Sequence, residues 1–421
     1  MMTTTLATNA TTTLPAFLTL EGELPQGLTL QPYEGKGGQF GLLHSQATGL
    51  SYLLFPGSQA VLPNGATVAL PGNTLLSNEQ LTPLASTPPP VPQTLCTQAM
   101  ILGAGLGTRI MPLTEQFTGF AKPSLPFVGE ESVIGLLVKR LAAFGIQRLF
   151  VNTYFQPHSV RAALDAAVAQ CPSPMQWFEV CEARPTGTAG GLLEILNHPE
   201  AFPAFNPNEP LLMLQGDAVT TADFNAMAAA HQAQASQRPS ITLGSQRVSD
   251  EDVSKFGIMA TNAQGRITHF LEKPSLAEAG PHRLGSTGFY MMDAGIFPVL
   301  QAWYQQRLQQ ERTATNQPTL ERCQEFDFAK DVFAGCLAED YPLHAFEVSA
   351  FWCDIGNPTQ YLHTLQQAYA GALPGLPLPA DTTPYYSPEG VFYWPKAYAP
   401  AQQEGLRLSG GVVVMPHQPL P

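Results

Sequence analysis

The stretch Met100–Arg109, Met-Ile-Leu-Gly-Ala-Gly-Leu-Gly-Thr-Arg, most constrains the fold of this 421-residue chain. Its apolar start is typical of a buried strand, and the strand breaks into three glycines. Glycine lets a backbone turn sharply and approach an anion through its N–H groups. Arg109 and, further on, Lys122 add cations beside this loop, where phosphate oxygens would need them. The sequence therefore predicts a strand followed by a loop that binds a nucleotide polyphosphate.

Two common glycine-loop motifs do not match this spacing. A P-loop requires Gly-Lys where Thr108 and Arg109 stand, and the dinucleotide motif Gly-x-Gly-x-x-Gly requires a glycine at position 108. A plain turn stays an alternative, since any α/β protein has glycines after its strands. The Thr-Arg pair and the later Lys122-Pro123 make that alternative less favoured.

Strand and helix patterns alternate beyond residue 96, which predicts an α/β fold with a mainly parallel sheet covered by helices on both faces. The expected elements are strands at Arg148–Asn152 and Leu211–Gln215, helices at Ser132–Phe144 and Pro157–Gln170, and a hairpin around Asn262–Gly265. Gly103, Asp217 and Asp354 then fall at strand ends. Ligands of open α/β sheets bind at such ends.

Several motifs recur in a recognisable order between Gln98 and Ala370. They are the glycine loop, Pro112-Leu-Thr, Lys122-Pro, Cys181–Gly191, Leu211–Asp217, Phe256-Gly257, Leu271–Pro274 and Trp352–Pro358. In this order they resemble the sugar-1-phosphate nucleotidyltransferase (nucleotide-sugar pyrophosphorylase) family. The form of Gly187–Gly191 looks closest to mannose-1-phosphate guanylyltransferases and related uridylyltransferases. The resemblance implies a Rossmann-like (GT-A-like) fold, with a mixed, mostly parallel sheet flanked by helices.

The resemblance also implies an activity and a set of site residues. A nucleoside triphosphate and a sugar-1-phosphate would react to give a nucleotide sugar and pyrophosphate. The implied nucleotide-binding residues are Gly103, Gly105, Leu106, Gly107, Thr108, Arg109, Lys122, Gly187 and Thr188. The implied sugar-phosphate-binding residues are Gly257, Glu272, Lys273 and Thr287. Catalysis is assigned to Arg109, Lys122, Asp217 and Lys273, and metal binding to Asp217 and Asp354.

The chemistry of this reaction predicts a metal ion. A sugar-1-phosphate is ionised at neutral pH, so its oxygen can attack the α-phosphorus without a general base. Catalysis then depends on positioning two polyanions and stabilising the departing pyrophosphate. Carboxylate ligands and a hard divalent cation suit this task, and Mg²⁺ is expected. Taken alone, Asp217 could be a helix N-cap and Asp354 a turn residue.

Two features depart from the family pattern. The segment between Thr114 and Lys122 is longer than the family's usual spacing, which would allow Lys122 to be displaced. Ser286-Thr287-Gly288 stands where the family has an Asn-x-Gly contact with the sugar. The second difference bears on sugar selectivity, because a hydroxyl replaces an amide.

Charge and cysteine usage limit the partners and the compartment. The chain has 20 basic and 33 acidic residues, a net charge of −13, which argues against nucleic acid and anionic membrane surfaces. The six cysteines form no Cys-x-x-Cys pair, and no basic residue precedes Lys36. No apolar run is long enough for a membrane span. We therefore expect a cytoplasmic protein. The family resemblance implies self-association into a homo-oligomer.

The chain divides into five expected parts. They are a disordered start (1–13), a small β-rich module of unknown role (14–86), a Pro-rich linker (87–95), the nucleotidyltransferase domain (96–371) and a Pro/Gly-rich C-terminal extension (372–421). Within the extension, Gly411–Met415 is expected to add one strand to a sheet edge. No hexapeptide repeat indicates a β-helix.

Two other function classes stay open. One is a non-catalytic member of the same fold that senses nucleotide sugars. The other is a cytidylyltransferase for a non-sugar phosphate, which would share the nucleotide half of the site and differ near Glu272. Pyrophosphate release with a panel of substrates separates these classes.

Overall fold

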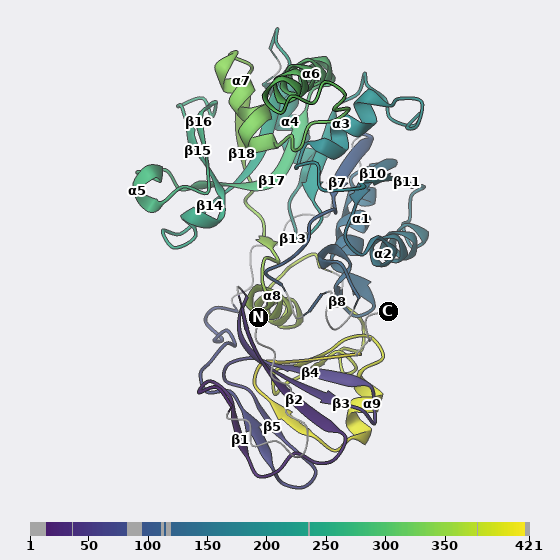
Figure 1. Cartoon of the computed structure of the whole chain (residues 1–421), viewed down its shortest axis with the longest axis vertical. Coiled ribbons are helices and arrows are strands. Elements are labelled where there is room, and N and C mark those ends of the chain that lie inside the picture. The colour runs from purple at the N-terminus through teal and green to yellow at the C-terminus, as the bar shows by residue number, and fades with distance from the viewer. Residues whose placement is uncertain are drawn as a thin grey trace.

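The computed structural model describes residues 14–35, 37–81, 95–110, 113–114, 119–234, 236–376 and 378–416. The expected disordered start, most of the Pro-rich linker and Pro112 lie outside these residues. Within the described part, a large α/β domain lies above a smaller β-rich part, with helix α8 (Pro358–Tyr369) between them (Figure 1).

A nine-stranded mixed sheet forms the centre of the α/β domain, in the order β11-β10-β7-β12-β17-β14-β18, and the β15–β16 hairpin joins it through β17. Its strands are β7 (Gln98–Leu102), β10 (Arg148–Thr153), β11 (Gln176–Cys181), β12 (Leu211–Gln215), β14 (Ile241–Arg247), β15 (Gly257–Thr261), β16 (Ile267–Glu272), β17 (Leu284–Met292) and β18 (Leu343–Glu347). Most neighbours along this order are parallel, and β17 runs antiparallel to β12 and β14. The expected mixed, mostly parallel sheet is confirmed.

Helices cover both faces of this sheet (Figure 1). The remaining helices of the domain are α1 (Val133–Ala143), α2 (Pro157–Ala169), α3 (Gly190–Asn197), α4 (Phe224–Ala233), α5 (Leu276–Ala279), α6 (Phe297–Ala314) and α7 (Ala334–Ala338). Apolar residues of α1, α2 and α4 share one buried cluster with the sheet, and those of α3, α6 and α7 share another. Because both faces are covered, strands such as β7 are buried at every position.

Local signals place the helix starts as the sequence predicts. The Ser132 side chain accepts a hydrogen bond from the Gly135 N–H and caps α1, and Gly145 follows the helix with φ 92°. Helix α2 begins at Pro157, whose missing N–H costs nothing at that position. Asp223, and not Asp217, caps the helix that follows β12. Asp217 is therefore free of the alternative role of a cap.

Short elements link these layers. They are β8 (Pro126–Val128) with β9 (Glu131–Ser132), β13 (Ala218–Thr220) with β19 (Trp352–Asp354), 3₁₀ turns at Lys122–Ser124, Val253–Lys255 and Ala294–Ile296, and a π-helical turn at Phe328–Phe333. The hairpin expected around Asn262–Gly265 is the β15–β16 hairpin. Among the described residues, no helix is long and apolar enough to cross a membrane. All six cysteines are free.

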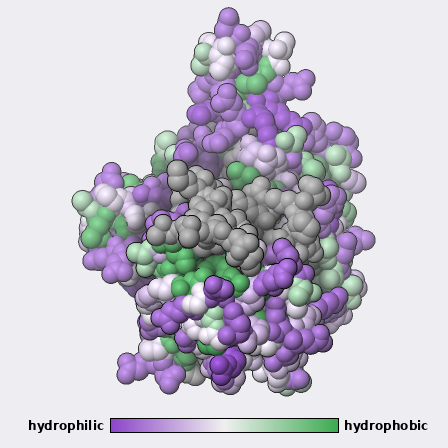
Figure 2. All heavy atoms as spheres, turned by 60° about the horizontal axis from the view of Figure 1, so that its bottom comes forward, coloured by the Kyte–Doolittle hydropathy of each residue, from purple (hydrophilic) through white to green (hydrophobic). Residues whose placement is uncertain are grey.

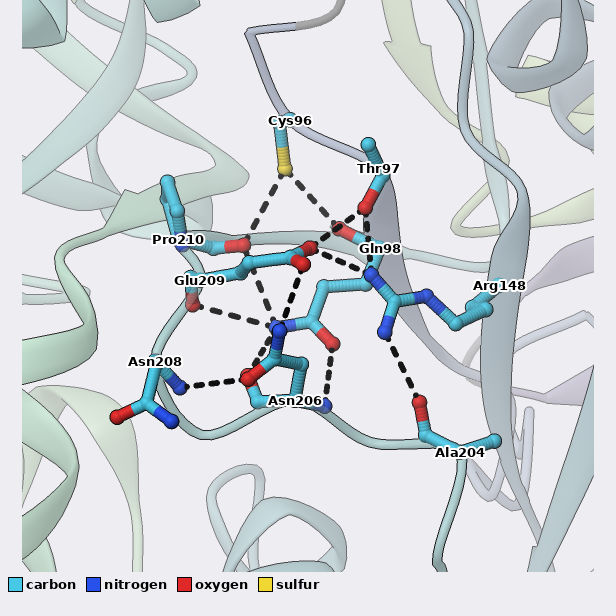
Figure 3. Close-up of polar contacts among 9 residues, drawn as sticks. All are labelled: Cys96, Thr97, Gln98, Arg148, Ala204, Asn206, Asn208, Glu209 and Pro210. Atoms are coloured by element: carbon cyan, nitrogen blue, oxygen red, sulfur yellow. Dashed lines mark hydrogen bonds and ion pairs between the residues drawn. The ribbon is translucent and has the colours of Figure 1, made fainter.

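A polar network fixes the amino ends of β7, β10 and β12 (Figure 3). The buried Gln98 amide donates to the Asn206 carbonyl at 2.8 Å and accepts from the Asn206 N–H at 3.0 Å. Arg148 pairs with Glu209 at 2.5 Å, and Glu209 also accepts from the Thr97 hydroxyl. The loop before β12 is thereby held against the amino ends of β7 and β10.

The two ends of the chain together form a second unit, the β module. Its elements are β1 (Thr19–Glu21), β2 (Leu28–Gly35), β3 (Gly38–Ser45), β4 (Leu50–Leu54), β5 (Gln59–Val61), β6 (Thr67–Ala69), β20 (Tyr386–Ser387), β21 (Val391–Tyr393), α9 (Tyr398–Gln403), β22 (Arg407–Ser409) and β23 (Val412–Pro416). One sheet has the order β1-β6-β5-β22 and the other β2-β3-β4-β23-β21-β20. Each sheet contains strands from both ends of the chain.

The expectation that Gly411–Met415 adds an edge strand is wrong. Strand β23 pairs with β4 on one side and with β21 on the other, so it is central. Its residues Val412 to Met415 are fully buried, which suits an interior strand better than an edge. Figure 2 shows that the module end of the molecule is mostly hydrophilic, with smaller apolar areas.

Candidate active site

The carboxyl ends of two parallel strands bring the first site residues together. The glycine loop follows β7, and Gly216, which follows β12, donates its N–H to the Leu102 carbonyl at 2.9 Å. Strand β13 then pairs with β19 in a register that places Ala218 opposite Asp354. The Ile355 N–H donates to the Asp217 carbonyl at 3.1 Å. Asp217 and Asp354, far apart in sequence, are therefore neighbours in the fold.

Lys122 lies between these two carboxylates. Its Nζ donates to Asp354 Oδ1 at 2.9 Å and forms a second, shorter ion pair with Asp217 Oδ2. The Lys122 residue is only 8% exposed. Burial alone would lower the pKa of Lys122, but the two carboxylates outweigh burial and raise it. The longer segment before Lys122 therefore leaves it at the centre of the site.

Asp354 is held in an environment that disfavours its charge. Burial and the nearby Asp217 raise the pKa of Asp354, in spite of the opposing charge of Lys122 and of Arg109. The Arg109 guanidinium is close by, because a Cβ atom on Gly356 would lie 3.6 Å from Arg109 Nη2 and 3.5 Å from Asp354 Oδ2. Arg109, Lys122, Asp217 and Asp354 thus share one site.

One part of the glycine loop is fixed by contacts within the protein, and the other part is exposed to solvent. The Gly103 N–H donates to Asn152 Oδ1 at 2.8 Å, so this amide is used inside the protein. Gly107 has φ 59° and packs against the Lys122 side chain. Gly105, Leu106 and Thr108 are exposed, and Leu106 is the most exposed large apolar residue described, at 47%. The open part is accessible to a ligand from solvent.

A cavity, the loop cavity, lies beside the glycine loop. Residues on its wall include Gly105, Lys122, Thr188, Gln215, Asp217 and Asp327. Glu182 also lines it, but accepts from the Asn152 amide at 2.6 Å and from the Thr186 N–H and hydroxyl at 3.1 and 2.9 Å. Since both oxygens of Glu182 are engaged, this residue shapes the loop after β11.

Gly187 and Thr188 lie against a segment that the sequence did not indicate. Gly187 has φ 88°, and a side chain there would overlap the backbone of Phe326. The Thr188 hydroxyl donates to Asp327 Oδ2 at 2.8 Å and accepts from the Phe328 N–H at 2.9 Å. This hydroxyl is therefore engaged within the protein. The π-helical turn begins at Phe328, and such turns are frequent at functional sites.

A second cavity, the hairpin cavity, adjoins the first. Gly257, Glu272, Lys273 and Thr287, all expected to bind the sugar phosphate, line it together with Arg109, Asp217 and Asp354. Lys273 has φ 46°, an uncommon conformation for a non-glycine residue, and its Nζ lies 3.6 Å from Glu272 Oε1. Asp217 lines both cavities, so it marks the place where they meet.

Sequence reasoning missed several residues of the hairpin cavity, namely Gln215, Tyr290, Asp327 and Trp352. A period of two along β17 was an available signal, because Ser286, Gly288 and Tyr290 share one face of that strand. Thr287 points differently: it is 1% exposed, and a Cβ on Gly244 would lie 2.6 Å from its hydroxyl.

The residues present fit a magnesium ion. No group of three or more His, Cys, Asp or Glu side chains suited to a metal occurs within the part of the chain that the structure describes. Asp217 and Asp354 are instead a pair of carboxylates whose oxygens converge, since both reach the Lys122 ammonium. Mg²⁺ is commonly held by one or two carboxylates and completes its shell with water and substrate phosphates.

The profile of the nucleotidyl transferase family matches residues 98–370, well over half of the 421-residue chain. The chain belongs to this family, as its motifs predict. The match covers the α/β domain, and the strands of the β module lie outside it.

Similar curated proteins carry a more specific name. Glucose-1-phosphate adenylyltransferase of Bacillus subtilis (strain 168) is 27% identical over 275 residues, which cover 62% of this chain and 63% of that protein. The protein of the same name from Geobacillus stearothermophilus is 30% identical over 275 residues, 62% of each chain. This chain thus spans less than two thirds of the length of these relatives. The crystal structure of HddC from Yersinia pseudotuberculosis is 18% identical, with a TM-score of 0.45 over 65% of this chain and 99% of that one.

Proposed function

We propose that this protein transfers a nucleotidyl group from a nucleoside triphosphate to a sugar-1-phosphate. One observation carries the proposal: Asp217 and Asp354 converge on Lys122 where the loop cavity and the hairpin cavity meet. Two anionic substrates held in adjoining cavities would place their reacting phosphates beside this cluster.

In the proposed reaction, the triphosphate occupies the loop cavity and the sugar phosphate the hairpin cavity. Arg109 and the amides of Gly105 to Gly107 bind the triphosphate, and Lys273 binds the sugar phosphate. An oxygen of the sugar phosphate attacks the α-phosphorus, the bond from that phosphorus to the bridging oxygen breaks, and pyrophosphate leaves with the bonding electrons. No proton needs to be removed, so positioning and charge stabilisation carry the catalysis.

Asp217 and Asp354 would hold Mg²⁺. The bound cation would offset the negative charge that develops on the phosphate oxygens. Lys122 supplies a fixed cation beside the same two carboxylates. Glu272, at the rim of the hairpin cavity, would accept hydrogen bonds from sugar hydroxyls. Its carboxylate lies close to Lys273, so phosphate and hydroxyl recognition would come from neighbouring side chains.

For the substrates themselves, we propose ATP and glucose-1-phosphate as the first pair to test. The support is the name of the similar proteins, glucose-1-phosphate adenylyltransferase. A second candidate pair is GTP with mannose-1-phosphate, which the form of Gly187–Gly191 favours. Because the Thr188 hydroxyl is engaged with Asp327, the base would be read by other groups of this loop.

Pyrophosphate release tests the proposal. The purified full chain is incubated with Mg²⁺, each of ATP, GTP, UTP, dTTP and CTP, and a panel of sugar-1-phosphates. Release that requires both substrates supports the proposal. Binding of nucleotide sugars without release in any combination would favour the sensor, and release only with CTP and a non-sugar phosphate would favour the cytidylyltransferase.

Two wider expectations are part of the same proposal. The cytoplasm is the proposed location, because the substrates are phosphorylated metabolites and all six cysteines are free. Self-association into a homo-oligomer is proposed from the family resemblance, and sedimentation of the purified chain at two concentrations checks it.

A further inference from the structure

The tip of the β2–β3 hairpin of the β module reaches the glycine loop. Gly37, at this tip, lies so close to Arg109 that a Cβ atom on it would overlap the Arg109 carbonyl oxygen. The same Cβ atom would lie 3.1 Å from Pro358 Cδ, the first residue of α8. Because the Arg109 carbonyl belongs to the backbone, a side chain at position 37 would force either the hairpin tip or the glycine loop to move.

The module also contacts the segments that carry the two aspartates. Ile110 follows Arg109, Ile355 follows Asp354, and Val219 lies two residues after Asp217. All three apolar residues are buried in a single hydrophobic cluster. Module residues complete that cluster: Phe40, Leu42, Leu53, Phe55, Trp394, Val413 and Met415. The back of the site and one face of the larger module sheet are therefore packed in one cluster.

Helix α8 connects the module to the same segments by hydrogen bonds. The Gln366 side chain accepts from the Leu76 N–H at 2.7 Å and donates to the Leu76 carbonyl at 3.0 Å. The Trp394 indole N–H donates to the Tyr361 hydroxyl at 3.0 Å, and that hydroxyl donates to the Pro126 carbonyl. Pro126 lies just after the 3₁₀ turn that begins at Lys122.

We propose that the β module is a positioning element for the nucleotide site, and that Gly37 is its positioning residue. The module sets where the glycine loop and Arg109 lie relative to Asp217 and Asp354, and the absence of a side chain at position 37 permits the required approach. This inference rests on the proposed nucleotidyl transfer, because it assigns Arg109 to the triphosphate. It gives a role to the part of the chain that lies outside the family match.

Gly37→Ala and Gly37→Val test the proposal in the full chain. Gly37 does not need a positive φ, so steric contact with Arg109 is the main change. We expect kcat/KM for the triphosphate to fall by about 10- to 100-fold, more for valine than for alanine, since a shift of about 1 Å at a reacting group costs about that much. The KM for the sugar phosphate should change less, because Arg109 is only one residue of the hairpin cavity wall and Lys273 is not part of this contact.

Gly65→Ala is the matched control. Gly65 lies in a turn of the module with φ 85°, and a Cβ atom on it would meet nothing within 4 Å. Alanine there strains the module by about 1 kcal/mol without touching Arg109. The control should keep wild-type kinetic constants even if its melting temperature falls, which separates loss of position from loss of stability.

Hydrogen exchange of the glycine loop gives a readout that needs no activity. The Ile110 N–H donates to the Gly107 carbonyl at 3.0 Å within this loop. Exchange in the peptide covering residues 103–110 should be faster in both Gly37 variants and unchanged in the control. If the Gly37 variants fold and their glycine loop exchanges at the wild-type rate, the inference is wrong. This result does not depend on pyrophosphate release, so it is distinct from a failure of the proposed function. If the valine variant does not fold, the alanine variant decides, because it adds a single methyl group.

Discussion

At the residue scale, the central fact is that Lys122 lies between Asp217 and Asp354. Two carboxylates so close to each other repel, and after burial Asp217 is the next cause that raises the pKa of Asp354. The Lys122 ammonium offsets this repulsion, and the raised pKa of Lys122 keeps it charged at neutral pH. The three side chains therefore act as one charge cluster, which leaves little tolerance for a change in any of them.

Asp217→Asn and Asp354→Asn should each reduce kcat by about a hundredfold or more while the fold persists, because each removes a negative charge from the cluster proposed to hold Mg²⁺ and keeps the shape. Pyrophosphate release measures the loss, and circular dichroism checks the fold. Asp340→Asn is the matched control: Asp340 has φ 61°, which asparagine tolerates, and pairs with Arg266 at the surface. Mg²⁺-dependent turnover retained by either site variant would refute the assignment.

Two different roles are suggested for Thr188, one by the sequence and one by the structure. The family resemblance assigns it to the nucleotide, whereas its hydroxyl bonds Asp327 and Phe328 in the structure. Thr188→Val removes the hydroxyl and keeps the shape. If the Asp327 bond is its role, kcat/KM should fall by similar factors for ATP and GTP. A change in the ratio of kcat/KM for the two triphosphates would instead indicate a direct contact with the base.

A site residue could be predicted from the sequence only where it stands in a recognisable local motif. Arg109, Asp217 and Asp354 stand in short motifs at strand ends, and the family resemblance of these motifs suggested their roles. Asp327 lies in a segment with no strand before it and reaches the site only because residues 326–328 pair with residues 186–189. Such a pairing between distant segments has no local sequence pattern.

At the element scale, the sequence predicted those elements whose signals are local. The apolar spacing of Ser132–Phe144, the proline at the start of α2 and the Asn262–Gly265 turn each mark an element within a few residues. The antiparallel pairing of β13 with β19, which brings the two aspartates together, joins segments far apart in the chain. The convergence of the aspartates was therefore an expectation from resemblance, and the periodicity of the sequence did not contain it.

The network at the amino end of β7 predicts a pH dependence of stability. Burial would raise the pKa of Glu209, but hydrogen bonds from Thr97 and Asn206 and the charge of Arg148 lower it below 4.5 (Figure 3). Because the folded pKa is the lower one, this carboxylate stabilises the fold above its unfolded pKa. That stabilisation is lost as pH falls through the folded pKa.

Glu209→Gln should therefore lower the free energy of unfolding at pH 7 by about 1 kcal/mol or less, since Glu209 is partly exposed. The difference from wild type should shrink as the pH falls below 4. Urea unfolding at several pH values measures this difference. A difference that stays constant from pH 7 to pH 3 would show that the Glu209 charge is not the source of the effect.

At the scale of the whole molecule, both chain ends meet in one module that packs against the α/β domain. Local patterns predicted strands in residues 14–86 and one near the C-terminus, but not that β23 would lie between β4 and β21. Strand order within a sheet depends on contacts across the whole chain. The cluster that contains both Phe55 and Tyr361 shows how far the two units share a core.

This shared core predicts that the module and the α/β domain unfold together. In guanidinium chloride, circular dichroism and tryptophan fluorescence should follow one transition with a single midpoint. Trp394→Phe should lower the stability of the whole chain by about 1–3 kcal/mol, because it removes the donor to Tyr361 and leaves a gap. Trp177→Phe is the control: its indole N–H donates to Asp165 at the exposed surface, so the change should stay within about 0.5 kcal/mol. Two separate transitions, with Trp394→Phe moving only one of them, would contradict the shared core, and the module would then be an independent unit.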